Sequence, residues 1–243
     1  MSENRKFSVL MSVYIKENPV FLEEAVKSIL HQTLKPSEVV IVEDGPLTPE
    51  LYQVLEKLAA QSSIPIKRCP LEQNRGLGLA LQYGVLQCQY DVIARMDTDD
   101  IAVEDRFEQQ FDLMEKENLD LLGGHIAEFI DQPDEIVSYR RVPIKHEEII
   151  AYQRMRSAFN HMTVMFKKEM VLRADNYEDG LYMEDDLLWL NMISAGARTG
   201  NVDQILCKVR VGAGMFERRG GLRYLKLYRQ ARQRMHARGQ ISY

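Results

Sequence analysis

The chain has 243 residues, of which 45% are hydrophobic and 28% are charged, a composition typical of a globular protein and not of a disordered or fibrous one. No apolar run approaches the roughly 18 residues that a membrane-spanning helix needs, and the first residues lack the apolar core of a signal peptide. The three cysteines are scattered without metal-site spacing, so we expect reduced thiols in a cytoplasmic protein.

The net charge of −5 is unevenly distributed along the chain. Residues 218–243 contain eight lysines and arginines and no acidic residue, so residues 1–217 carry a charge of −13, from 23 basic and 36 acidic side chains. A basic tail on an acidic body predicts an anionic partner for the tail.

The first half of the chain alternates buried-strand patterns with helical patterns. We expect strands at residues 7–15, 38–42, 64–70 and 91–96, and helices at residues 19–33, 49–61, 76–87 and 103–117. Asn18 and Thr48, each followed by proline, are typical helix N-caps. Such alternation predicts βαβ units and a mainly parallel sheet, whose ligands bind at the carboxyl ends of the strands.

The alternation weakens in the second half. We expect one or two strands at residues 120–131, a helix at 146–155, a strand running into a helix at 161–171, a helix at 181–196 and a strand at 204–212. Because no linker separates the halves, we expect them to complete one sheet. The second half, from about residue 119, would complete the same sheet and supply the site of another substrate, and residues 218–243 would form a helical tail.

Three carboxylates, those of Asp97, Asp99 and Asp100, follow the fourth predicted strand. Two carboxylates at positions i and i+2 of a tight turn can present oxygens to one hard cation, Mg²⁺ or Mn²⁺. The alternative is that Asp99 or Asp100 caps the helix that follows. From these residues alone both interpretations stay open.

Two further loops lie at the same predicted edge. Asp44, before Gly45, either accepts hydrogen bonds from a base or ribose or belongs to a plain turn. Asn74, Gly76 and Gly78 open a helix, where glycine allows a ligand to approach N–H groups closely, although an ordinary helix start explains them equally well.

Other candidates carry charge in unusual places. Arg95 lies in an otherwise apolar strand, so it must pair with a neighbouring carboxylate or with phosphate. Glu184 and Asp185 begin a helix with Asp186, where acids either complement the helix dipole or supply a general base. His161 is a lone histidine, and such residues are more often structural than catalytic.

The segments "SVLMSVYIKENPVFLEEAVKSILHQT", "VVIVEDGP", "NRGLGLAL", "ARMDTDD" and "MEDDLLW" occur in this order. Together they resemble the family 2 inverting glycosyltransferases of the GT-A fold, especially bacterial enzymes of O-antigen and capsule assembly. "VEDGP" with the basic "RRGGLRYLK" resembles the enzymes that extend undecaprenyl-diphosphate-linked sugars. The resemblance implies an α/β protein with one Rossmann-like, mainly parallel sheet flanked by helices, and a basic C-terminal helix.

The resemblance also implies a division of the chain and residue roles. Residues 1–118 would form a nucleotide-sugar half and residues 119–217 an acceptor half. Asp185 would be the catalytic base, Asp99 would bind Mn²⁺ or Mg²⁺ at the diphosphate, and Asp97 would contact the ribose, which leaves Asp100 as the cap of the following helix. Asp44 would hold the uracil or ribose. The other substrate contacts implied are Ser12, Val13, Tyr14, Glu17, Asn74, Gly76, Arg95, His161 and Glu184. The family often has asparagine where Gln82 stands, so Gln82 receives no role.

The implied reaction moves a hexose, galactose or glucose, from a UDP-sugar to a lipid-diphosphate-linked sugar, with inversion. The enzyme would be cytoplasmic and peripheral on the inner face of the plasma membrane. Leu222, Leu225, Tyr228 and Met235 give the tail an apolar stripe for an anionic membrane surface. The alternative is that the tail packs on its own acidic body.

Two other functions keep the fold. A nucleotidyltransferase that makes NDP-sugars usually has a glycine- and arginine-rich loop after its first strand, and "SVYIKENP" has none. A non-catalytic nucleotide- or glycan-binding module would not need both Asp99 and Asp185. We do not expect nucleic-acid binding, because the body is acidic and shows no aromatic platform.

Overall fold

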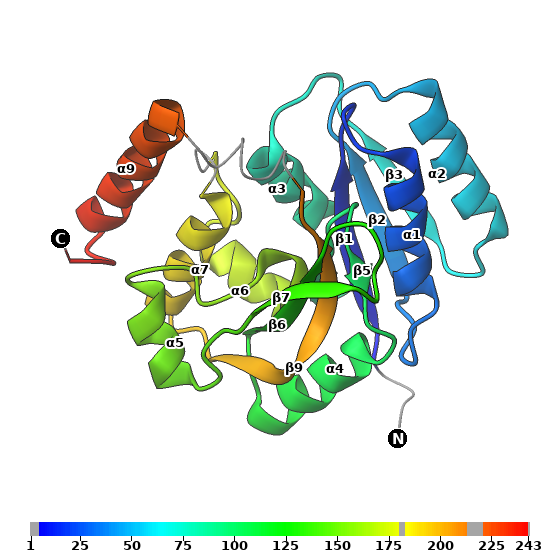
Figure 1. Ribbon diagram of the computed structural model, residues 1–243. Coiled ribbons are helices and arrows are strands. Elements are labelled where there is room, and N and C mark those ends of the chain that lie inside the picture. The colour runs from blue at the N-terminus through cyan, green and yellow to red at the C-terminus, as the bar shows by residue number, and fades with distance from the viewer. Residues whose placement is uncertain (1–4, 180–182, 213–220, 243) are drawn as a thin grey trace.

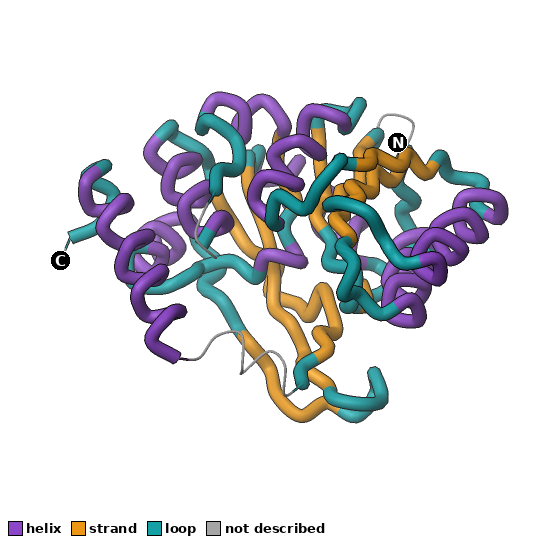
Figure 2. Tube along the Cα trace, turned by 90° about the horizontal axis from the view of Figure 1, so that it is seen from above, coloured by secondary structure: helices purple, strands orange, loops and turns teal. Residues whose placement is uncertain are grey.

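The computed structural model describes residues 5–179, 183–212 and 221–242. In this part of the chain, nine strands form one curled sheet with helices on its faces (Figure 1). The strand order is β3-β2-β1-β4-β8-β6-β9-β5, and β7 pairs with β6 beside this path. Figure 2, seen from above, shows the strands running through the middle of the molecule with helices around them.

The strands are β1 (Phe7–Val13), β2 (Glu38–Glu43), β3 (Ile66–Pro70), β4 (Val92–Arg95), β5 (Ile101–Ala102), β6 (Leu121–Phe129), β7 (Ile136–Arg140), β8 (Met165–Lys167) and β9 (Thr199–Arg210). The helices are α1 (Pro19–Leu30), α2 (Pro49–Gln61), α3 (Leu77–Gln87), α4 (Arg106–Glu117), α5 (His146–Gln153), α6 (Lys168–Arg173), α7 (Glu184–Ser194) and α9 (Gly221–Ala237), with a short 3₁₀ helix, η1 (His161–Thr163).

The first half forms the predicted parallel sheet. β1 pairs in parallel with β2 and β4, and β2 pairs in parallel with β3, so their carboxyl ends lie at one edge. The predicted N-caps are confirmed: Asn18 Oδ1 accepts the N–H of Val20 at 2.8 Å, and Thr48 Oγ1 accepts that of Leu51 at 3.3 Å. The acidic loops after β2 and β4 therefore share one rim.

The second half completes the same sheet, as predicted. Antiparallel β8 joins β4 to β6, and β6 continues in parallel with β9. The division into a nucleotide-sugar half and an acceptor half stays a prediction.

Some boundaries differ from those expected. The two-residue β5 and the edge strand β7 were not predicted, β9 begins at Thr199 and not at residue 204, and α4 begins at Arg106 and not near residue 103. β5 is too short to show periodicity, and β7 exposes its apolar side chains Val137 and Tyr139, which breaks the alternation expected of a half-buried strand.

Helix α9 lies at one end of the molecule, on the outer side of α7 (Figure 1). Met235 in α9 and Ile241 after it are buried against Leu187 and Leu190 of α7. Met235 is only 2% exposed, so its predicted place on a membrane-facing stripe is wrong. None of the helices in the described ranges is long and apolar enough to cross a membrane.

Candidate active site

The loops after β1, β2 and β4 meet at the carboxyl edge of the sheet. The backbone N–H of Asp44 donates to Val13 O at 2.8 Å, and that of Met96 donates to Leu10 O at 3.1 Å. Val13 is buried, whereas Ser12, Tyr14 and Glu17 are partly exposed at the end of β1. The structure thus brings the predicted nucleotide-binding segment 12–17 to the same edge as Asp44 and the acidic loop.

Asp44 binds the loop that begins α3. Its carboxylate accepts hydrogen bonds from the backbone N–H of Arg75 at 2.7 Å, from that of Gly76 at 3.0 Å and from Asn74 Nδ2 at 2.9 Å. Gly76 has a φ of 85°, which glycine adopts readily. Three predicted substrate contacts, Asp44, Asn74 and Gly76, therefore contact one another, and Asp44 fixes the start of α3 at the rim.

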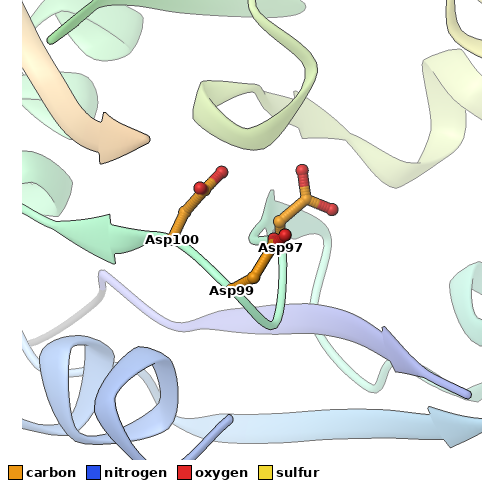
Figure 3. A group of neighbouring side chains, drawn as sticks. All are labelled: Asp97, Asp99 and Asp100. Atoms are coloured by element: carbon orange, nitrogen blue, oxygen red, sulfur yellow. The ribbon is translucent and has the colours of Figure 1, made fainter. Parts of the chain in front are cut away.

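The three carboxylates after β4 form one cluster. Oxygens of Asp97, Asp99 and Asp100 lie within 4.8 Å of one another, and the side chains rise from a single loop (Figure 3). Burial, and then the charges of Asp99 and Asp97, raise the pKa of Asp100 well above its usual range. The predicted helix cap at Asp100 is wrong: Asp105 precedes α4, and Asp100 Oδ1 instead accepts the N–H of Arg210 at 3.0 Å.

This cluster suits a hard divalent cation. Carboxylate oxygens are the ligands that Mg²⁺ and Mn²⁺ prefer, and three such groups at this separation repel one another unless positive charge compensates them. The donor set at Asp97, Asp99 and Asp100 therefore fits the predicted metal.

Two buried arginines lie beside the acidic cluster. Arg95 is only 2% exposed and forms an ion pair with Asp97. A neighbouring carboxylate was one of the two partners predicted for this arginine. Arg106, fully buried, donates to the carbonyl oxygen of Arg95 at 2.7 Å and to Met96 Sδ at 3.1 Å. The sequence did not single out Arg106, because its position in an amphipathic helix is equally typical of an exposed side chain.

The acidic start of α7 lies in the electrostatic field of the same site. Burial, and then the carboxylates of Asp186 and Glu184, raise the pKa of Asp185 to about 8, and Arg95 acts against them. Asp186 Oδ1 accepts a hydrogen bond from Gln153 Nε2 at 2.7 Å, which joins α7 to α5. Burial raises the pKa of Glu184 and Asp186 as well, so this turn is one in which carboxyl pKa values are shifted toward the range of a general base.

His161 belongs to an aromatic cluster next to Arg95. Its Nε2 lies 3.0 Å from the hydroxyl of Tyr177, and its ring centroid lies 5.8 Å from that of Trp189. Burial, and then Arg95, lower the pKa of His161 well below its usual range, so the imidazole is neutral. Trp189 ends the quoted segment "MEDDLLW" but received no role from the sequence, and Tyr177 lies outside every quoted segment.

Gly78 brings α3 against the segment that precedes α7. A methyl group at this position would overlap the carbonyl oxygen of Glu178 and would lie 2.9 Å from Glu184 Cβ. We predicted that glycine here would let a ligand approach the helix closely. In the structure, it is the Glu178 carbonyl oxygen and the Glu184 side chain that approach Gly78. This contact joins the Asp44 loop, through α3, to the turn that carries Asp185.

Comparisons with known proteins agree with this geometry. The family model "Glycosyl transferase family 2" matches residues 8–181. An uncharacterized glycosyltransferase of Haemophilus influenzae is 46% identical to this chain, and the match covers 91% of this chain and 82% of the relative. The amylovoran biosynthesis glycosyltransferase AmsE of Erwinia amylovora is 42% identical, and the match covers 90% of this chain and 82% of the relative. A UDP-Gal:alpha-D-GlcNAc-diphosphoundecaprenol beta-1,3-galactosyltransferase of Escherichia coli is 38% identical over 98% and 86%.

Solved structures share the fold at low sequence identity. The S. aureus TarS 1–349 structure in complex with UDP-GlcNAc has a TM-score of 0.68 at 18% identity, over 93% of this chain and 65% of that one. The mannosyltransferase PcManGT of Pyrobaculum calidifontis, in complex with GDP-Man and Mn²⁺, has a TM-score of 0.65 at 15% identity, over 85% and 57%. This chain thus spans about three fifths of those two solved chains. It belongs to glycosyl transferase family 2, and it is a glycosyltransferase with the GT-A fold.

Proposed function

We propose that this enzyme transfers a hexose, with galactose favoured over glucose, from a UDP-sugar to a lipid-diphosphate-linked sugar during synthesis of a bacterial surface polysaccharide. Support comes from the Escherichia coli relative, which uses UDP-Gal and a GlcNAc-diphosphoundecaprenol, and from the amylovoran enzyme. The amylovoran enzyme is similar over 90% of this chain, and the Escherichia coli relative over 98%.

The observation that carries the proposal is the electrostatic link between Asp185 and the acidic cluster. Arg95 forms an ion pair with Asp97, and its charge also acts on the pKa of Asp185, which supports a shared site for the proposed base and the proposed diphosphate ligands. A donor whose diphosphate lies at the cluster would present its sugar toward the first turn of α7.

The chemistry follows from this arrangement. The carboxylate of Asp185 accepts the proton of the acceptor hydroxyl, whose oxygen attacks the anomeric carbon of the donor sugar. The bond from that carbon to the diphosphate oxygen breaks, and UDP leaves with the electron pair. One base without an enzyme nucleophile predicts a single displacement with inversion at the anomeric carbon.

The cluster of Asp97, Asp99 and Asp100 would hold a Mn²⁺ or Mg²⁺ ion, with Asp99 as the principal ligand and Asp97 near the ribose. Such an ion, when bound, neutralises charge that develops on the departing diphosphate. Arg95 and Arg106 keep the loop that carries these ligands in place, Arg95 through the Asp97 side chain and Arg106 through the Arg95 carbonyl.

The nucleotide would lie over the end of β1. Backbone groups of Ser12, Val13 and Tyr14 and the side chain of Glu17 would line that position, and the Asp44 loop, which shares this edge of the sheet, would close it. The contacts of Asp44 with Arg75 and Gly76 support a role in shaping the pocket in addition to the proposed contact with uracil or ribose.

We also propose peripheral binding to the cytoplasmic face of the membrane through the first half of α9. Leu222 is 86% exposed, Leu225 60% and Tyr228 36%, and the basic residues Lys226 and Arg229 are exposed on the same helix. Each basic residue near an anionic leaflet contributes about 1 kcal/mol, and exposed apolar side chains add to binding. Replacing Leu222 and Leu225 by glutamate should abolish flotation with anionic liposomes, and unchanged flotation would remove this part of the proposal.

A panel of UDP-sugars tests the proposed reaction. We expect UDP release with UDP-Gal, or with UDP-Glc, only when Mn²⁺ or Mg²⁺ and a GlcNAc-diphospho-lipid are both present, together with a lipid-linked disaccharide. A nucleotidyltransferase would instead release pyrophosphate from UTP and a sugar phosphate, and a binding module would retain the donor without releasing UDP. Either of those results contradicts the proposal.

A further inference from the structure

Residues 176–179, which we call the strap, lie between α3 and α9 and lead toward α7. On the α3 side, Gln82 Nε2 donates to the carbonyl oxygen of Tyr177 at 2.6 Å, and Asn176 Nδ2 donates to Gln82 O at 3.0 Å. Gly78 lies against the Glu178 carbonyl, as described above. The strap is therefore fixed to α3 by side-chain hydrogen bonds and close backbone packing.

The other side of the strap is held by the last turns of α9 and the residue that follows them. Arg238 donates to both carboxylate oxygens of Glu178, at 2.5 and 3.1 Å, and Arg234 Nη1 donates to Asp179 O at 2.8 Å. Gln240 Nε2 also donates to Asn191 Oδ1 of α7 at 2.7 Å. Together with the buried Met235 and Ile241, these contacts join the C-terminal end of the chain to both the strap and α7.

The strap carries one side chain into the active site. Tyr177 is fully buried, its hydroxyl lies 3.0 Å from His161 Nε2, and its ring centroid lies 6.3 Å from that of Trp189 in α7. The charges of Arg95 and Asp185 both act on its pKa, so the Tyr177 hydroxyl shares the electrostatic environment of the proposed base. Movement of the strap therefore moves Tyr177, which contacts His161 and the Trp189 side chain of α7, the helix whose first turn carries Asp185.

We infer that Arg234 and Arg238, acting through Glu178 and the Asp179 carbonyl, are positioning residues for the first turn of α7 and hence for Asp185. This inference rests on the role of Asp185 in the proposed function. It divides the basic tail into two parts with different roles: the first half of α9 is exposed and is the part proposed to bind a membrane, and the second half supports the active site.

The size of the expected effect follows from the exposure of the ion pair. The side chains of Arg238 and Glu178 are 39% and 28% exposed, so their attraction adds little to the stability of the fold. A catalytic group displaced by about 1 Å, however, can lose on the order of 10²-fold in rate. Loss of the pair should therefore change turnover far more than it changes thermal stability.

Charge reversal with a compensating double variant tests the inference. We expect Arg238→Glu and Glu178→Arg to lower kcat by about 10- to 100-fold, with the KM for the donor changed less than about threefold, and the double variant to regain at least tenfold. Arg173→Glu is the matched control, because Arg173 lies three residues before the strap but pairs with Glu169 at 2.7 Å within α6, so this ion pair joins the strap to neither α7 nor α9. We expect Arg173→Glu to keep the wild-type kcat.

Trp189 gives a second readout that does not depend on activity, because it is the single tryptophan of the chain and lies beside Tyr177. Each single reversal should make its fluorescence more accessible to acrylamide quenching, and the double variant should restore protection. Single variants with wild-type kcat or wild-type quenching, or a double variant no better than the singles, would overturn the inference. Retained transfer by an Asp185 variant would instead refute the proposed base, while the quenching data would still report on the strap.

Discussion

Replacement of Gly78 by alanine tests how closely α3 and α7 must approach. The added methyl group would overlap the Glu178 carbonyl and lie 2.9 Å from Glu184 Cβ, whereas ordinary contact begins near 3.4 Å. Relief requires the strap and the first turn of α7 to move back by about 0.5 to 1 Å, since carbon atoms pack at about 3.5 to 4.0 Å. Asp185 lies in that turn, so we expect kcat to fall by on the order of 10- to 100-fold.

The effect on stability should be smaller, because two contributions oppose each other. Alanine in a helix is about 1 kcal/mol more favourable than glycine, and overpacking costs about 1 to 3 kcal/mol, so the free energy of unfolding should fall by no more than about 2 kcal/mol. Steady-state transfer kinetics and thermal unfolding measure the two effects. Gly212→Ala is the control, because a methyl group there meets nothing within 4 Å. A Gly78→Ala enzyme with wild-type kcat and raised stability would refute the packing argument.

Further predictions concern protonation, the pocket and the metal. A general base must be deprotonated, and the pKa of Asp185 is raised to about 8, so kcat/KM should rise with pH through that region. Asp186→Asn removes a neighbouring negative charge and should therefore move this rise to lower pH. A flat pH profile of kcat/KM from pH 6.5 to 9 would contradict the prediction. The same raised pKa means that Asp185 lowers stability as pH increases from its unfolded value near 4 toward 8. In metal-free buffer at pH 8, Asp185→Asn should therefore raise the free energy of unfolding by at least about 1 kcal/mol, and unchanged denaturation midpoints would count against the shift. Asp44→Ala removes three hydrogen bonds to the loop before α3, so the KM for the UDP-sugar should rise at least about tenfold. An unchanged KM would show that the position of this loop does not depend on Asp44. Asp99→Asn should weaken Mn²⁺ binding, measured by calorimetry, at least about tenfold, and wild-type affinity would exclude Asp99 as a ligand.

The carboxyl edge of the sheet was predictable from local patterns. Nearly continuous apolar runs at β1 and β2 indicated strands covered on both faces. The two acidic loops directly follow β2 and β4 in the sequence. Parallel pairing then places Asp44 and Asp97 at one rim without any knowledge of distant contacts. The position of the candidate site thus followed from periodicity and connection length.

Other features depend on residues far apart in the chain, and they were not predictable. Asp100 binds the N–H of Arg210, 110 residues away, so the sequence favoured a local helix cap instead. The burial of Arg106 depends on the carbonyl of Arg95 and on Cys207 Sγ, which lies 3.3 Å from its Nη1. Local helical periodicity contains no information about such partners.

The tail shows the same limit. Its eight basic residues look alike in sequence, and a membrane-binding arm and a packed C-terminal segment were both consistent with them. The structure separates them, because Arg238 meets Glu178 and Met235 meets α7, while Leu222 and Leu225 remain exposed. Packing on the body is therefore confirmed for the end of the tail, while membrane binding by the first half of α9 stays a prediction.

Asp185→Asn tests the central claim most directly. The variant keeps the shape of the side chain and removes its ability to accept a proton, so we expect UDP-sugar affinity within about threefold of wild type and transfer to the lipid-linked acceptor reduced by at least about 10²-fold. Asp186→Asn serves as the neighbouring control, because Asp186 contacts Gln153 of α5, and it should retain transfer. Transfer by Asp185→Asn at the wild-type rate, with the donor still bound, would contradict the assignment of Asp185 as the base.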